Sequence, residues 1–552
     1  SGDELVFRLV DEWYINMDWR DKIKTIVDEI QWIPEWGRER EHEWLDNMGD
    51  WMISKKRFWG LALPIWTFED DSFIVVGSKE ELQELAVEGW DNFDGNSPHR
   101  PWIDRVKIQH PETGLIGTRI KDVGNPWLDA GIVPFSTLKY NTDRDYWSEW
   151  FPGDFVTECF PGQFRNWFYS LLAMSAELEG QAPFKTLLGH ALVKDETGRD
   201  MHKSWGNAIW FDDAAEKMGV DVMRWMYALQ NVEQNLLFGY GPADEVRKKI
   251  ITLWNVYSFY ATYAAVDGFD PIQHPLKKDS LTILDRWIIA KIHLLLKTGQ
   301  TAMDEFRVDQ FMKSFQVFLE ELSNWYVRRN RRRFWKSEDD QDKNSAYATL
   351  YYVLTHTVRA IAPVLPFVSE TIYQNLVRNS ENATVESVHL WDFPAADETW
   401  IDQDLVRNVD ALKKCVELGR SARSQSNIKI RQPLSKVSYA IEDNRIAAFF
   451  EENQAVVLDE LNVKSMERIT ETDRLISYRI KPNLRTLGQK YGRGLAEIRT
   501  LLDSGDVTQI VGELQDTGEI KLKDGTYCLD RDDVFIETEA TEGFAAASDS
   551  GI

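Results

Sequence analysis

Cysteine is scarce in this chain. Three cysteines (Cys159, Cys415 and Cys528) occur among 552 residues, and no two of them stand at CxxC spacing. This count excludes a disulfide-stabilised scaffold and gives no support for a cysteine-rich zinc site. Such low cysteine use is typical of a reducing compartment, so we expect a cytoplasmic protein.

Long apolar runs and an excess of basic charge are also missing. No apolar run approaches the roughly 18–20 residues that a membrane-spanning helix needs, so we expect no membrane partner. Acidic residues outnumber basic ones by 90 to 64, which gives a formal net charge of -26. That balance argues against a general nucleic-acid binder but does not exclude a local basic patch. With 43% apolar and 28% charged residues, the composition excludes global disorder.

The pattern of apolar residues divides the chain into three parts. Strands alternate with helices over residues 1–245, which predicts an α/β fold with a parallel sheet. Within this part, a small module of short strands with one helix (78–88) is expected at about 67–120. Residues 246–395 carry long helical patterns, which predict an antiparallel helix bundle. Residues 396–552 begin with a charged helix and continue as short strands and helices, which predicts a small α+β module.

A polar loop between a buried strand (187–193) and a helix (including 212–218) is the strongest local signal for chemistry. The loop contains Asp200-Met201-His202-Lys203-Ser204. Lys203 would neutralise the charge that builds on the phosphates of a bound triphosphate, and backbone N–H groups beside it could meet phosphate oxygens. The alternative is a solvated surface loop whose lysine has no role, and the loop residues alone leave both interpretations open.

One stretch of the chain is strongly basic. Within positions 328–336 there are six cations: Arg328, Arg329, Arg331, Arg332, Arg333 and Lys336. Aromatic residues, including Trp325 and Trp335, are interleaved with them. Cations contact phosphates and aromatic rings stack on unpaired bases, so this stretch predicts RNA contact. The alternative is a helix with one salt-bridged face and one buried aromatic face. At 3.6 residues per turn the arginines cannot all face one way, so this alternative must hold in part.

Several segments resemble signatures of the class I aminoacyl-tRNA synthetases. The loop around Lys203 is similar to their KMSKS signature, with Asp200 and His202 at the places of its first lysine and first serine. Residues 50–60 (DWMISKKRFWG) look like the DWxISRQRxWG block of the isoleucine, leucine and valine enzymes, and residues 122–131 (DVGNPWLDAG) are similar to their DVxDVWFDSG block.

Other segments narrow the resemblance to the isoleucine enzymes. Residues 158–169 (ECFPGQFRNWFY) resemble EGxDQxRGWFY, with one extra residue and Gly162 at the usual aspartate. Residues 322–335 (LSNWYVRRNRRRFW) closely resemble LSNWYVRRxRRRFW. Residues 428–434 and 481–488 are similar to KVRQPL and KPNxxxLG. The resemblance runs from about residue 5 to the C-terminus, and the order and number of its blocks make it specific.

This resemblance implies both a fold and an activity. The fold would be multidomain, with the C-terminal half of a class I Rossmann-type catalytic domain, an all-α anticodon-binding helix bundle and a small α+β C-terminal module. The activity would be ATP-dependent ligation of isoleucine to tRNA(Ile) through an isoleucyl-adenylate, by a monomer that uses ATP with Mg²⁺ as co-substrate. Two alternatives stay open: a tRNA-binding module without ligase activity, and a ligase specific for valine or leucine.

The resemblance also implies site residues. Lys203 would be the catalytic residue. Expected ATP contacts are Met201, Lys203, Ser204, Gly189 and His190, and expected contacts to the amino acid or adenylate are Glu158, Gln163 and Trp59. Expected tRNA contacts are Trp325, Arg328, Arg329, Arg331, Arg332, Arg333 and Trp335. Structural roles are the alternatives for three of these residues: a solvated strand-end carboxylate for Glu158, a core tryptophan for Trp59 and a packed histidine for His190.

Features of the family are missing from the sequence. No HIGH-like motif, the family's other ATP signature, precedes Trp51, and the family's editing domain would lie before Ser1. We therefore expect a piece of a longer chain that lacks the HIGH-bearing half and most of the editing domain. Many family members carry a cysteine-based zinc knuckle after the WG block, but residues 67–71 (TFEDD) contain no cysteine, so no zinc is predicted there.

Overall fold

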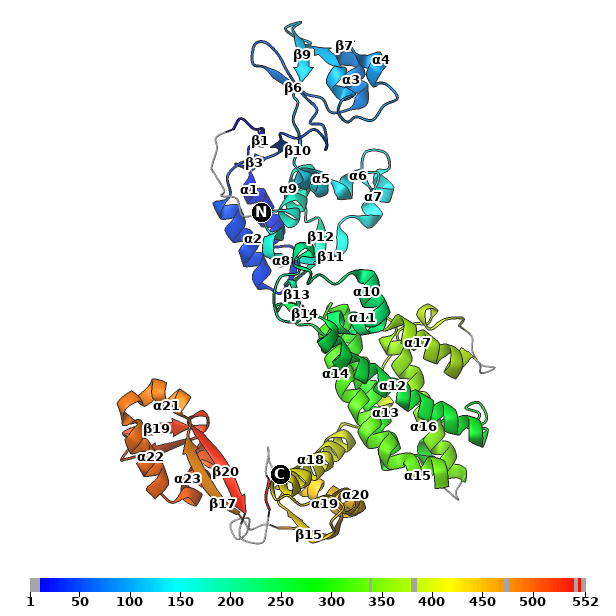
Figure 1. Cartoon of the computed structure of the whole chain (residues 1–552), viewed down its shortest axis with the longest axis vertical. Coiled ribbons are helices and arrows are strands. Elements are labelled where there is room, and N and C mark those ends of the chain that lie inside the picture. Colours follow the sequence, from blue (N-terminus) through cyan, green and yellow to red (C-terminus); the bar gives the residue numbers. More distant parts are fainter. Residues whose placement is uncertain (1–9, 337–339, 379–384, 470–475, 541–544, 548–552) are drawn as a thin grey trace.

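A computed structural model describes residues 10–336, 340–378, 385–469, 476–540 and 545–547. Figure 1 shows that the chain runs from a region of mixed strands and helices into a helical bundle, and then into two smaller C-terminal units. Within the described ranges, no helix is long and apolar enough to cross a membrane.

A parallel sheet organises the first region. Its strands lie in the order β11 (Gly153–Cys159), β12 (Phe184–His190) and β2 (Gln31–Ile33), and both neighbouring pairs are parallel. Strand β12 (FKTLLGH) is rich in apolar residues, as expected of a strand buried between layers. The predicted α/β fold class is confirmed for this region.

Helices complete the core around this sheet. The helices are α1 (Arg20–Val27), α2 (Trp36–Asn47) and α9 (Trp167–Leu178), and α1 packs against both α2 and α9. Helix α9 is apolar on nearly all sides and is therefore largely buried. The shared core includes Trp32, Phe160, Phe168, Tyr169, Leu172, Phe184 and Leu187.

A separate five-stranded antiparallel sheet lies in the predicted inserted module. Its order is β6-β5-β9-β8-β7, with strands Phe73–Val75, Ile65–Thr67, Ile116–Arg119, Lys107–Gln109 and Ala86–Glu88. The helix predicted over 78–88 was too long. Helix α3 (Lys79–Leu85) begins after the cap residue Ser78, whose Oγ accepts from the Glu81 N–H at 3.0 Å, and it ends before β7. Residues 86–88 leave the helix because they pair with β8, and Gly89 (φ 81°) then turns the chain.

Two shorter segments connect the sheet region to the bundle. Strands β13 (Val193–Asp195) and β14 (Leu236–Phe238) form a parallel pair. Between them lie the predicted phosphate loop and helices α10 (Phe211–Lys217) and α11 (Val220–Leu229). The strand predicted over 187–193 is therefore two strands, β12 and β13, with a break at residues 191–192.

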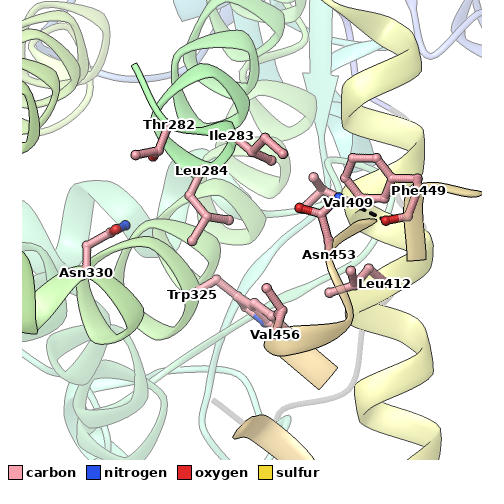
Figure 2. Close-up of a pocket in the computed structure, with 10 residues that line it drawn as sticks. All are labelled: Thr282, Ile283, Leu284, Trp325, Asn330, Val409, Leu412, Phe449, Asn453 and Val456. Atoms are coloured by element: carbon pink, nitrogen blue, oxygen red, sulfur yellow. Dashed lines mark hydrogen bonds between the residues drawn. The ribbon is translucent and has the colours of Figure 1, made fainter. Parts of the chain in front are cut away.

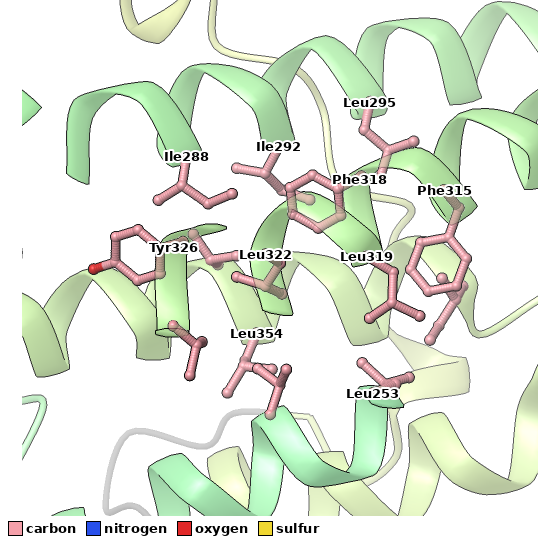
Figure 3. Close-up of a cluster of buried hydrophobic side chains, with 14 of the residues drawn as sticks. Leu253, Ile288, Ile292, Leu295, Phe315, Phe318, Leu319, Leu322, Tyr326 and Leu354 are labelled. Atoms are coloured by element: carbon pink, nitrogen blue, oxygen red, sulfur yellow. The ribbon is translucent and has the colours of Figure 1, made fainter. Parts of the chain in front are cut away.

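Long helices form the bundle, as predicted. They are α12 (Tyr240–Asp267), α13 (Ile283–Asp304), α14 (Val308–Glu321), α15 (Arg328–Lys336), α16 (Asp340–Ile361) and α17 (Pro366–Tyr373). A π-helical turn, η4 (Leu322–Val327), joins α14 to α15. Figure 3 shows how aliphatic and aromatic side chains of these helices interdigitate, including Leu253, Ile288, Ile292, Phe315, Phe318, Leu322 and Leu354.

The C-terminal part contains two packing units. The first unit shares one hydrophobic core with the bundle. It consists of helices α18 (Gln403–Gln425), α19 (Asn444–Glu452) and α20 (Gln454–Leu461) and of the parallel strands β15 (Leu434–Tyr439) and β16 (Val463–Arg468). The second unit has its own hydrophobic core. Two antiparallel strand pairs contribute to it: β17 (Ile476–Pro482) with β20 (Val534–Ala540), and β18 (Glu519–Leu522) with β19 (Tyr527–Asp530). The helices that cover these strands are α21 (Leu484–Tyr491), α22 (Leu495–Ser504) and α23 (Val507–Thr517).

Candidate functional site

The carboxyl ends of two parallel strands bring together three of the predicted site residues. In the register of β11 and β12, Glu158 lies opposite Gly189 and Cys159 lies opposite His190. One Glu158 oxygen, Oε1, accepts a hydrogen bond from the Cys159 N–H at 2.7 Å. His190 Nδ1 lies 2.8 Å from the Ala191 carbonyl oxygen, so this nitrogen carries a proton. In parallel α/β sheets, ligands bind beyond the carboxyl ends of the strands, which is where these residues lie.

Local packing explains why glycine occupies position 189. A Cβ placed on it would lie 1.7 Å from a ring carbon of Phe160, which is buried. No side chain fits between that ring and the strand, so the absent Cβ serves the packing of Phe160. The ATP contact predicted for Gly189 stays a prediction beside this reason.

Gln163 stands in a kinked turn after β11. The turn, α8 (Phe160–Gln163), contains Gly162 at φ 109°, a conformation that favours glycine. This backbone angle explains why glycine occupies the place where the resembling family has aspartate. Gln163 Oε1 accepts from the Trp167 N–H at 3.3 Å and so links this turn to the first residue of α9.

The predicted phosphate loop is internally hydrogen-bonded. Asn207 reaches across it: its Nδ2 donates to Asp195 Oδ2 and to the Asp200 carbonyl oxygen, both at 2.8 Å, and its Oδ1 accepts from the His202 N–H at 3.0 Å. Together with bonds from Arg199 and Thr197, the Asn207 bond holds the pKa of Asp195 well below its usual range. The sequence alone indicates no role for Asn207, although this residue stands within the segment that resembles the family signature.

A salt bridge closes the base of the loop. Lys194 Nζ lies 2.8 Å from Asp200 Oδ1, and this hydrogen bond holds the pKa of the Asp200 carboxyl below its usual range. The same two residues form an isolated antiparallel bridge. Asp200, one of the two departures from the family signature, therefore has a structural partner in this chain.

Lys203 lies at the exposed end of this loop. It begins a 3₁₀ turn (Lys203–Trp205), and its Nζ stands 4.5 Å from the centroid of the Trp210 ring. An ammonium over an indole face is a weak, readily exchanged interaction, so the cation can be given up to a phosphate. Met201 is half-buried, and Ser204 is exposed beside Lys203. The side chains of Trp205, Trp210 and Phe211 are also largely exposed around the loop.

Trp59 is placed apart from the strand-end residues. Its side chain is 72% exposed, and its ring stacks on His99 at a centroid distance of 5.5 Å. His99 belongs to the inserted module. Contacts among the described residues therefore attach Trp59 to that module and not to Glu158 or Gln163.

The basic helix divides into paired and unpaired arginines. Arg328 Nη2 lies 2.7 and 2.8 Å from the two carboxylate oxygens of Glu460, and Arg329 Nη1 lies 2.5 Å from Oε1 of the same residue. Arg420 also bonds to Glu460. Burial alone would raise the pKa of Glu460, but the hydrogen bonds from Arg328 and Arg329 hold it below its usual range.

Arg333 is turned inward, whereas Arg331 and Arg332 are exposed. Arg333 binds Asp285 and Asp342, and these bonds raise its pKa although burial alone would lower it. Among the described residues, the side chains of Arg331 and Arg332 make no hydrogen bond or ion pair. Trp325 is buried and Trp335 is 47% exposed. Of the predicted tRNA contacts, Arg331, Arg332 and Trp335 are exposed, and Arg328 is also exposed but holds Glu460; the side chain of Lys336 lies outside the described residues.

Family comparison matches both the loop region and the basic helix. Residues 2–238 match a family model described as tRNA synthetases class I (I, L, M and V), and residues 285–438 match the anticodon-binding domain of tRNA ligase. The chain therefore carries a class I tRNA synthetase domain and an anticodon-binding domain of tRNA ligase, as predicted.

Curated relatives of this chain include isoleucine–tRNA ligases. The enzyme of Clostridium novyi is 36% identical over 99% of this chain and 53% of its own length. The enzyme of Methanothermobacter marburgensis is 35% identical over 99% of this chain and 52% of its own. The chain spans about half the length of the curated relatives it matches. A solved ternary complex of Agrobacterium radiobacter K84 agnB2 LeuRS with tRNA and LeuAMS aligns with 64% of this chain and with 43% of its own chain, at 17% sequence identity. The TM-score of this alignment is 0.47, which is too low to support an argument.

In the part of the chain that the structure describes, no group of three or more His, Cys, Asp or Glu side chains is arranged to hold a metal ion. The sequence expectation about zinc after the WG block stays a prediction.

Proposed function

We propose that this chain provides part of the active site and the tRNA-binding surface of an isoleucine–tRNA ligase. The proposed reaction has two steps. The isoleucine carboxylate attacks the α-phosphorus of ATP and displaces pyrophosphate, and the terminal hydroxyl of tRNA(Ile) then attacks the carbonyl of the adenylate and displaces AMP. The observation that carries the proposal is the exposed ammonium of Lys203 on a loop that Asn207 holds in place.

Lys203 has the chemistry that the first step needs. Negative charge builds on the phosphates as pyrophosphate leaves, and a positioned cation stabilises that charge more in the transition state than in bound ATP. Mg²⁺ that accompanies ATP would supply further charge neutralisation. Met201 and Ser204 flank the lysine, and Gly189 and His190 at the end of β12 are the proposed neighbours of the adenine.

Glu158 and Gln163 are proposed to orient the amino acid and the adenylate. Glu158 uses one oxygen to accept from the Cys159 N–H and lies at the carboxyl end of β11, so its other oxygen can accept from an ammonium. Gln163 uses Oε1 on Trp167 N–H and keeps its amide N–H groups for a ligand. Trp59 is proposed as a wall of the amino-acid pocket, which requires its exposed ring to be covered when the amino acid binds.

For tRNA, we propose that Arg331, Arg332 and Trp335 make direct contacts from α15. Arg328 and Arg329 contribute positive charge while they hold Glu460. Arg333 and Trp325 support the helix from within the bundle. We further propose a cytoplasmic monomer, which sedimentation of the native protein would test: a stable dimer would contradict it.

The experiment for the proposed reaction is isoleucine-dependent exchange of pyrophosphate into ATP by the native protein. Lys203→Ala should lower kcat about 10²–10³-fold, the usual loss when one group that stabilises transition-state charge is removed. Lys217→Ala is the matched control because Lys217 is an exposed lysine that pairs with Asp213 on the neighbouring helix α10. Equal rates for Lys203→Ala and the parent would contradict the role of Lys203.

A second candidate function is tRNA binding without ligation. The observation in its favour is that residues 285–438 match the anticodon-binding domain of tRNA ligase. Under this alternative, the native protein binds tRNA but gives no exchange with any amino acid. A ligase specific for valine or leucine is distinguished by side-by-side exchange with the three amino acids.

A further inference from the structure

The helical bundle contains a large pocket at the end of α12. Its volume is about 610 Å³, within the range of about 300–1,000 Å³ that is usual for small-molecule sites. The cavity where the bundle meets α18, α19 and α20 is smaller, at about 180 Å³, and none of the described residues that line it is charged (Figure 2). The two share no lining residue, so the larger pocket is a separate feature of the bundle.

Three segments enclose this pocket, which we call the α12 pocket. The last turns of α12 form one wall, and the loop of residues 268–273 follows directly from them. Tyr351 of α16 and Asn375 of the π-helical turn η5 (Gln374–Arg378) supply the rest. The wall is part of the packed bundle, because α12 packs against α16 and α16 against η5.

Short side chains keep the α12 pocket open. Ala261, Ala264 and Ala265 follow one another at spacings that place them on one side of the helix, and Tyr257 and Tyr260 precede them on that side. Alanine leaves most of the space in front of the helix unfilled. The wall therefore offers an apolar surface with room for the body of a ligand.

The polar side chains of the pocket offer hydrogen-bond acceptors. Asp270 Oδ1 accepts from the Ile272 N–H at 2.8 Å, and Oδ2 accepts from Gln273 Nε2 at 2.9 Å. A carboxylate has about four lone-pair sites, so Asp270 can accept further bonds. Asn375 Nδ2 donates to the Thr371 carbonyl oxygen at 2.9 Å. Among the described residues, the amide oxygens of Gln273 and Asn375 accept no hydrogen bond, so they too are available to a donor.

The charge and the rings of the pocket favour a cation. Among the described residues that line it, none is Lys, Arg or His, and Asp270 is the one carboxylate. The rings of Tyr260 and Tyr351 lie 6.2 Å apart between centroids, with an angle of 38° between their planes. The negative face of a tyrosine ring attracts an ammonium group. Acceptors, a carboxylate and aromatic faces together complement a positively charged donor.

We propose that the α12 pocket binds an organic ammonium ion, a small amine in its protonated form with an apolar body. The ammonium group donates to Asp270 and to the amide oxygen of Gln273 beside it. The apolar body lies along Ala261 and Ala265, against the tyrosine rings. This site is independent of the proposed ligase reaction, since none of its residues belongs to the strand ends or to the loop that carries Lys203.

Calorimetric titration of the native protein with 2-phenylethylammonium chloride tests the site. About 0.15 M NaCl in the buffer screens the acidic surface, whose formal net charge of -26 attracts cations without a specific site. We expect one saturable site per chain. The neutral compound 2-phenylethanol has the same apolar body and should bind at least about tenfold more weakly, the usual loss for one hydrogen bond to a charged group.

Two substitutions address the two halves of the pocket. Asp270→Asn removes the charge but keeps an oxygen for the Ile272 N–H, and it should weaken binding at least about tenfold. Asp279→Asn is its control, because this exposed aspartate makes the same change of charge outside the pocket. Ala265→Leu should abolish saturable binding, because leucine occupies the space in front of the helix.

Thr262→Leu is the control for Ala265→Leu, because Thr262 is exposed on the same helix and does not line the pocket. Thermal melts of each variant establish that it is folded. Weaker binding in Asp270→Asn and Ala265→Leu, with parental binding in both controls, supports the site. Binding that is equal in all variants, equal affinity for 2-phenylethanol, or no saturable binding by the parent would overturn it. Ligase activity is not measured in this titration, so none of these outcomes bears on the proposed reaction.

Discussion

Arg333 and Asp285 form a two-point ion pair inside the helical bundle. Arg333 Nη1 lies 2.8 Å from Oδ1 and Nη2 lies 2.9 Å from Oδ2 of Asp285, whose side chain is fully buried. The same carboxylate accepts from the Tyr326 hydroxyl at 2.7 Å and from the Thr282 N–H at 2.9 Å. The pair therefore fastens the basic helix α15 to the first turn of α13, and Arg333 differs in role from the exposed Arg332 beside it.

Arg333→Gln should destabilise the bundle by about 3–5 kcal/mol, because it leaves a buried carboxylate without its counter-charge. Urea unfolding followed by circular dichroism measures this loss. Arg332→Gln, an exposed neighbour, should stay within about 0.5 kcal/mol of the parent. Equal destabilisation by both substitutions would show that the ion pair does not distinguish them.

Glu41 should make stability depend on pH. Both its carboxylate oxygens are buried and have no hydrogen-bond partner in the described structure, and burial raises its pKa well above the ordinary 4.5. The folded state then holds this proton more tightly than the unfolded chain. Stability from this group is complete below pH 4.5 and declines as pH rises from there towards the raised pKa of the folded state.

Glu41→Gln removes this dependence. At pH 7 it should stabilise the folded protein by about 1.4 kcal/mol for each pH unit below 7 over which the stability contribution of Glu41 has declined, with little change at pH 4. Glu43→Gln is the control, because Glu43 is exposed and pairs with Arg40 on the same helix. Melting temperatures across pH 4–8 test the difference. A lower melting temperature for Glu41→Gln than for the parent at pH 7 would mean that Glu41 has a stabilising partner.

Gly189→Ala should disturb the end of β12. Its methyl group would overlap the Phe160 ring, so we expect a loss of about 1–3 kcal/mol. Gly49→Ala is a suitable control, since no atom lies within 4 Å of its added Cβ. Pairing Gly189→Ala with Phe160→Leu should recover part of the loss. An additive double variant would show that the ring is not the cause.

Asn207→Ala should loosen the loop that carries Lys203. Three hydrogen bonds at 2.8–3.0 Å are lost, including the one that fixes the His202 amide. Faster hydrogen exchange at residues 195–207 and a lower kcat for exchange should appear together, because positioning of the lysine is impaired. Asn96→Ala is the control, because this exposed asparagine lies in the inserted module. Unchanged hydrogen exchange in Asn207→Ala would contradict the role of Asn207.

Local patterns predicted the larger elements well, because hydrophobic periodicity and the residues that interrupt helices and strands act over short stretches of sequence. Alternating strands and helices gave the parallel sheet, and long amphipathic repeats gave the bundle. Misplaced ends came from tertiary contacts: residues 86–88 left a predicted helix to pair with β8. The parallel pairing that brings Glu158 opposite Gly189 joins residues 31 positions apart, which no local pattern encodes.

In the candidate site, the basic helix α15 also makes tertiary contacts that local sequence patterns do not predict. Helical geometry predicted that its arginines point different ways, but not which ones find carboxylates. Arg328 pairs with Glu460 across 132 positions of sequence, and Arg333 pairs with Asp285 across 48. Glu460 and Arg420 carried no signal of their own in the sequence. The composition alone could not separate the exposed Arg331 and Arg332 from the arginines that pair with carboxylates.

Side-by-side exchange of pyrophosphate into ATP by the native protein, with isoleucine, valine and leucine, tests the central claim most directly. We expect the highest kcat/KM with isoleucine, and a kcat about 10²–10³-fold lower in Lys203→Ala. No exchange with any of the three amino acids, in a native protein that still binds tRNA, would contradict it.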